Sequence, residues 1–143
     1  MLVENIELDT VVEVKAPMAL RSIGSYSLTL TKNLQTTGFI QVRAGYDRVE
    51  DTTYYGSLTL EDITITAKAN VSAIYGLVDV QSIDTSTVAE LVLGSGAVLT
   101  GHAGSTYAWG GGIYANKARV VLEYSSEISG NIATRGGAVT VAN

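Results

Sequence analysis

Few residues in this chain are of the types that carry out catalysis. His102 is the only histidine and cysteine is absent, so any His-based triad would have to be built around this one residue. The same two facts argue against a multi-histidine or thiolate metal site. We therefore expect His102 to have a structural or merely exposed role, at a turn position of the kind that polar residues favour.

The glycine cluster Gly110-Gly111-Gly112 could in principle cradle a phosphate group. It lacks the Lys-Ser/Thr pair that completes a phosphate-binding loop, and no helix is expected after it. The residues that follow, 113–116, contain no aspartate and do not match the calcium-binding nonapeptide. We interpret the cluster as a bend between strands.

Two small groups of acidic residues could offer oxygen ligands to calcium. Asp47, Glu50 and Asp51 lie in one segment, and Glu61 and Asp62 lie in another. We favour solvated loop charge for both groups and predict no metal site and no cofactor. Calcium binding by the first group is the alternative that the sequence leaves open.

The aromatic residues are the best candidates for recognition, because most of them fall in two insertions or at outward positions of expected strands. Binding residues are predicted at Tyr54, Tyr55, Tyr107, Trp109 and Tyr114. Together with Tyr46 they could make one stacking surface for a sugar or a protein. The competing interpretation is that they pack the long loops against the rest of the fold.

The elements that would position these residues follow a repeat of about 30 residues. Ser-Leu-Thr-Leu at 27–30 recurs at 57–60, and similar alternation returns at 91–93 and 120–122. The first expected ladder is Leu28, Leu58, Leu91 and Val120, with Leu30, Leu60, Leu93 and Leu122 beside it. A second column is Ile65, Leu99 and Ile128. A third is Ile40/Val42, Val78/Val80, Ile113/Ala115 and Val139/Val141, with Gly38, Gly76, Gly112 and Gly137 before the pairs.

This alternation has period two, which predicts strands and not helices. A β-sandwich has no reason to repeat the same residue type in the same column, whereas stacked coils do. We therefore predict an all-β parallel β-helix (solenoid) of about four coils of three short strands. Residues 6–20 would add a less regular coil with Pro17 at its corner, and 45–55 and 102–109 are insertions.

The segment from Ile128 to Val139 contains Ser-Gly-Asn at 129–131 and Gly-Gly-Ala-Val at 136–139. It resembles the paired GGA[ILV] and FxxN repeats of polymorphic outer-membrane proteins and bacterial adhesin-like β-helix proteins, with Ile128 in place of phenylalanine. The resemblance implies a right-handed parallel β-helix, exported and displayed on a cell surface for adhesion or as a stalk. It implies no catalytic residue.

Composition narrows the possible functions. Of 143 residues, 46% are hydrophobic and 16% charged, which predicts one folded domain over 1–143. The net charge of −5, with no basic patch, argues against nucleic acid as a partner. No run approaches the ~18 apolar residues of a membrane span, and the first residues do not resemble a signal peptide. We expect a fragment of a larger surface protein.

The predicted function is that of a non-catalytic structural or adhesive segment of an exported bacterial surface protein, located outside the cell. Its expected partner is a host or cell-surface glycan or protein. One alternative is a fragment of a β-helix carbohydrate-active enzyme, a lyase or hydrolase. Against it, no outward face concentrates acids or bases: the outward residues are Thr29, Thr59, Val92, Val121, Gln41, Asp79, Tyr114 and Thr140. Another alternative is a fibre unit that self-associates by end-to-end stacking of coils.

Overall fold

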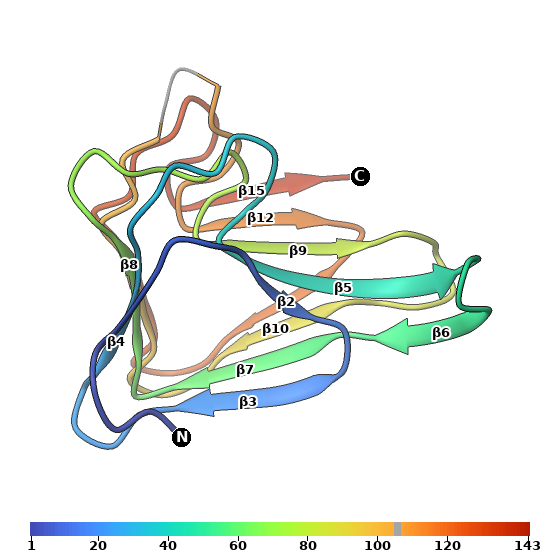
Figure 1. The fold of residues 1–143 in the computed structure, drawn as a ribbon, viewed down its shortest axis with the longest axis horizontal. Coiled ribbons are helices and arrows are strands. Elements are labelled where there is room, and N and C mark those ends of the chain that lie inside the picture. The colour runs from blue at the N-terminus through green and yellow to red at the C-terminus, as the bar shows by residue number, and fades with distance from the viewer. Residues whose placement is uncertain (105–106) are drawn as a thin grey trace.

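The computed structural model describes residues 1–104 and 107–143, and within them the chain is all-β with no helix. Most of its strands lie in three parallel sheets that form the sides of a triangle in Figure 1. The first sheet contains β1 (Ile6–Leu8), β4 (Ser27–Leu30), β8 (Thr64–Ala67), β11 (Val98–Thr100) and β14 (Glu127–Ser129). The second contains β3 (Pro17–Arg21), β7 (Ser57–Glu61), β10 (Glu90–Leu93) and β13 (Arg119–Leu122). The third contains β2 (Val12–Val14), β5 (Ile40–Asp47), β9 (Val78–Ser82), β12 (Ile113–Asn116) and β15 (Val139–Ala142).

The chain visits the three sheets in a fixed order. After β1 and β2, each pass runs through the second sheet, then the first, then the third, and the next pass pairs with it strand by strand in parallel. One strand departs from this path, since β6 (Thr52–Tyr55) pairs antiparallel with the far end of β5. The arrangement confirms the prediction of an all-β fold of short parallel strands and is consistent with a parallel β-helix.

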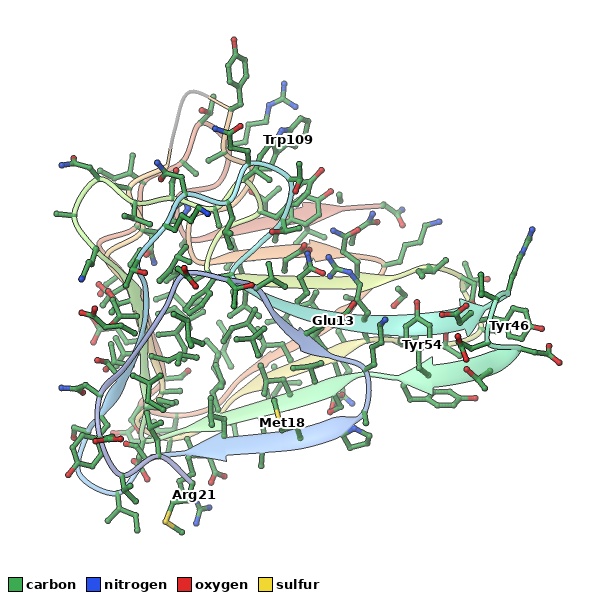
Figure 2. All side chains as sticks on the ribbon, in the orientation of Figure 1. Glu13, Met18, Arg21, Tyr46, Tyr54 and Trp109 are labelled. Atoms are coloured by element: carbon green, nitrogen blue, oxygen red, sulfur yellow. The ribbon has the colours of Figure 1, made fainter. Side chains whose placement is uncertain are left out.

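The core lies inside the triangle, where alternate residues of each strand point (Figure 2). The third predicted column is confirmed, since Ile40, Val78, Ile113 and Val139 are successive Cα partners. The whole second column is confirmed in the same way, because Leu99 pairs with both Ile65 and Ile128, and part of the first column is confirmed as well. Because equivalent positions stack directly on one another, like residues build continuous aliphatic ladders, and most of the leucines within them are fully buried.

The predicted place of Leu28 and Leu30 is wrong. Leu28 pairs with Ile65 and Leu30 with Ala67 in the first sheet, while the identical Ser-Leu-Thr-Leu word at 57–60 lies in the second sheet. The true partner of Leu58 on the preceding pass is Met18. The β5–β6 segment lengthens this pass, so a period of about 30 residues selects the wrong strand, and alternation alone cannot distinguish one sheet from another.

A column of glycines stands where the chain enters the third sheet, and one predicted member is wrong. The amide of Phe39 donates to Gly76 O, the amide of Leu77 to Gly111 O, and the amide of Gly112 to Gly137 O. The aligned glycine is therefore Gly111 and not Gly112. A Cβ at Gly111 would lie 2.1 Å from Gly137 O, so the neighbouring backbones pack too closely for any other residue.

The first residues form strands as expected, although they are shared among the three sheets. Ile6 and Leu8 pair with Leu28 and Leu30, while Val12 and Val14 pair with the start of β5. Pro17 opens β3, the outermost strand of the second sheet, where its missing N–H breaks no ladder bond.

Candidate functional site

The aromatic residues proposed as one stacking surface lie in separate places. Figure 2 shows Trp109 among the turns that precede the third sheet, whereas Tyr46 and Tyr54 lie on the β5–β6 hairpin at the other end of that sheet. Tyr114 lies between these places, on the outer face of β12. The prediction of one joint surface is therefore wrong, because the two insertions leave different corners of the triangle.

Tyr107 lines a surface groove of about 450 Å³ between consecutive turns. The ring is 75% exposed, and the loops that lead to β5 and β9 complete the groove. The lining residues are Asn33, Leu34, Gln35, Ser72, Ile74 and Tyr107. Tyr107 belongs to the insertion 102–109. Two other residues of this insertion, Ser105 and Thr106, lie outside the described residues.

Backbone hydrogen bonds hold the two loops of the groove side by side. The amide of Leu34 donates to Ser72 O at 2.9 Å, and the amide of Ile74 donates to Leu34 O at 2.9 Å. Asn33 adds a side-chain link, because its Oδ1 accepts the amide of Ser72 at 2.8 Å. Leu34 and Ala73 thus form a parallel bridge outside the named strands, so the groove has an ordered floor.

Beneath this floor lies His102, which is only 1% exposed. Its Nδ1 lies 3.0 Å from Ile132 O, and its Nε2 lies 3.0 Å from the amide nitrogen and 2.9 Å from the carbonyl oxygen of Ala73. The amide of His102 donates in turn to Asn131 Oδ1 at 3.0 Å. One imidazole therefore links three successive passes, which agrees with the structural role expected for it.

Trp109 packs between turns and is not among the described residues that line the groove. Its ring faces the Arg135 guanidinium at 4.0 Å, a cation–π contact. Its amide donates to Ile74 O at 2.7 Å, and its indole stays 38% exposed. Of the two aromatics predicted in this insertion, Tyr107 offers the freer ring.

Tyr114 points outward but is only 8% exposed. Its ring lies 4.7 Å from the ring of Tyr75, centroid to centroid, at 39°. Burial raises the pKa of Tyr114, and the nearby Tyr75 and Asp79 raise it further. Tyr114 offers little surface to a ligand, because the turns before the third sheet cover it.

The neighbouring Asp79 is the carboxylate that a catalytic strand face would need, yet it is fully buried. Arg43 Nη2 donates to its Oδ2 at 2.6 Å, and Gln81 Nε2 donates to its Oδ1 at 2.7 Å. Arg43 also donates to the Asp79 carbonyl at 2.8 Å. Both carboxylate oxygens are occupied by the protein, so this face presents Asp79 to no substrate.

The β5–β6 hairpin carries the other predicted binding residues. Tyr55 is 56% exposed, and Tyr54 is half-buried, with Lys15 Nζ 5.6 Å from its ring centroid. In the turn, Asp47 Oδ1 accepts the amides of Glu50 and Val49, which lowers the pKa of Asp47.

Two acidic side chains of the hairpin turn, those of Asp47 and Asp51, are engaged within the protein. The Tyr46 hydroxyl donates to Asp51, which raises the pKa of Tyr46. Among the residues that the structure describes, no three acidic, histidine or cysteine side chains are grouped to hold a metal ion.

Sequence reasoning found Tyr107 but missed Asn33, Gln35 and Ser72. These polar residues come from two different passes, and nothing in either stretch alone marks them as a group. The available signal was their shared position a few residues before the glycine column at Gly38 and Gly76.

The chain was also compared with known proteins. No family model, no curated protein and no solved structure matches it.

Proposed function

We propose that the chain is a right-handed parallel β-helix segment that acts as a non-catalytic adhesive rod of an exported bacterial surface protein. The single observation that carries this proposal is the separation of ladder and loops. Consecutive passes pair in register in all three sheets, while the hairpin and the Tyr107 loop leave the stack without interrupting it. A paired stack that holds exposed loops in place suits recognition better than turnover.

The resemblance of the segment from Ile128 to Val139 to adhesin-like repeats supports the same proposal. Its asparagine, Asn131, accepts the amide of His102 and donates to Leu99 O at 2.9 Å. The motif residue thus binds the neighbouring pass through both ends of its amide. A stacking role for this motif favours a structural repeat over a reactive one.

The enzyme alternative has less support, because Asp79 is buried and fully bonded. Another acid at the equivalent outward position two strands away, Glu13, pairs with Lys15 at 3.2 Å, and both side chains are about half exposed. Exposed surface pairs of this kind contribute little to stability, and no second acid of this column is exposed beside Glu13, since Gln41 follows it. No helix among the described residues is long and apolar enough to cross a membrane.

A two-part experiment tests the proposal on the purified chain. Immobilised protein is presented with a glycan array, and the same protein is incubated with pectins, alginates and glycosaminoglycans. We expect saturable retention of a ligand and no release of reducing ends or unsaturated products. Turnover that disappears on replacing a single exposed acid, as in Glu13→Gln, in a variant that melts like the unaltered chain would establish the enzyme alternative. Absence of any retained ligand would contradict the adhesive role.

A further inference from the structure

We propose that the groove lined by Tyr107 binds a short neutral saccharide. The inference rests on the proposed adhesive function and assigns its ligand class and its place. The volume of about 450 Å³ lies within the roughly 300–1,000 Å³ of small-ligand sites.

The lining chemistry selects a polyhydroxylated ligand. Asn33 and Gln35 are exposed, and each carries an amide with both donor and acceptor atoms, while Ser72 carries a hydroxyl. Such groups match vicinal sugar hydroxyls, which also donate and accept. Leu34 and Ile74 add apolar contact for the C–H faces of a sugar ring.

Tyr107 provides the aromatic platform. Its ring is 75% exposed at the edge of the groove, which leaves it available to stack on the apolar face of a ring. Trp109 does not compete for this role, because Arg135 covers its ring at 4.0 Å.

The absence of charge in the described lining selects a neutral ligand. All six lining residues are uncharged, so an anionic saccharide would lose water from its carboxylate without gaining a cation. Arg135, a cation of the neighbouring turns, is engaged with Trp109. These observations favour a neutral sugar over a uronate, a sialylated glycan or a charged peptide.

The floor of the groove is preorganised, which reduces the entropy lost on binding. Asn33 is held by the amide of Ser72 at 2.8 Å, and the backbone of Leu34 is bonded to both Ser72 and Ile74. His102 fixes Ala73, between those two residues, from below. The Asn33 side chain and the backbone of the floor are therefore positioned before a ligand arrives.

The test measures binding of lactose, maltose, cellobiose and their uronate or sialylated counterparts by calorimetry and by amide chemical shifts. Tyr107→Ala is compared with Tyr124→Ala, a control on a tyrosine that is 95% exposed and lies in a turn between the second and first sheets. We expect one neutral sugar to bind, with affinity about tenfold lower in Tyr107→Ala and unchanged in Tyr124→Ala. Gln35→Ala should also weaken binding.

The outcomes separate this inference from the proposed function. Binding that survives Tyr107→Ala but is lost in Tyr54→Ala/Tyr55→Ala would place recognition on the hairpin, so the groove proposal would fail while the adhesive role stands. Exclusive binding of charged saccharides or of a peptide would overturn the ligand class. Cleavage of a bound sugar would overturn the non-catalytic function but not the site. Silence with these saccharides together with retention of another ligand on the array would overturn the groove proposal alone, and silence in both experiments would overturn both proposals.

Discussion

The stacked ladders predict that residues of one column contribute very different amounts to the free energy of unfolding. Leu60 and Leu122 lie in the same column of the second sheet, with Leu93 between them. Leu60 is 0% exposed, whereas Leu122 is 55% exposed. The two leucines are equivalent in the sequence pattern, so a comparison of their alanine variants isolates the effect of burial.

Leu60→Ala removes buried methyl groups from a site closed by Leu20 on one side and Leu93 on the other. Such truncations cost about 2–5 kcal/mol, because a lost transfer free energy adds to a residual cavity. For a domain of this size, that loss lowers the melting temperature by roughly 8–20 °C. Leu122→Ala should cost about 1 kcal/mol or less, because the side chain is already half solvated.

Urea denaturation and thermal melts followed by far-UV circular dichroism measure both losses. Unchanged slopes of the free energy against urea would show that the two variants unfold from comparable states. Equal destabilisation by Leu60→Ala and Leu122→Ala would refute the reasoning, since it would mean that burial within the stack does not set the stability of the column. A stable Leu60→Asp variant would refute it more directly, since that change buries a carboxylate among aliphatic neighbours.

Two further predictions concern polar groups. His102→Ala leaves the buried amide of Ala73 without its acceptor, so we expect the free energy of unfolding to fall by about 1–3 kcal/mol, plus the cost of the cavity. His102→Gln retains an acceptor and should lose less stability in the same urea assay. Equal losses in the two variants would exclude this hydrogen bond as the cause. The hydroxyls of Ser86 and Thr87 lower the pKa of Asp84 from 3.8 to about 2, so its stabilising contribution is complete above about pH 4 and is lost as pH falls through about 2. Carboxyl NMR titration of Asp84 should show its midpoint return toward 3.8 in Ser86→Ala/Thr87→Ala, and an unchanged midpoint would contradict the assigned cause.

The two-residue alternation was readable from the sequence because it is a local property of a strand. Ile40/Val42 and Val78/Val80 each show it without reference to any other part of the chain, and they do pair. The glycine column could be predicted from the sequence except that Gly111, and not Gly112, is the aligned residue. Close backbone packing permits only glycine at that position.

The strand partners of residues 27–30 could not be predicted from the sequence, because pairing depends on how many residues lie between the strands. The word at 27–30 is identical to the word at 57–60, yet the two occupy different sheets. Only the stacked fold reveals that the β5–β6 hairpin shifts the spacing. The burial of Asp79 could not be predicted either, because alternation along its own strand places it on the outward face. It is buried because Arg43 of the neighbouring strand and the turns before the sheet cover it.

The candidate site shows the same division. The alternation, the single histidine and the lack of cysteine already indicate an all-β chain of short strands that is poor in catalytic groups, with exposed aromatics in its insertions. The tertiary structure shows that Tyr107 lines one groove with Asn33 and Ser72, that Trp109 packs its ring against Arg135 outside that lining, and that Tyr54 lies far from Trp109. The physical reason is that alternation is set within one strand, whereas a groove is set by the register of three passes that are distant along the chain.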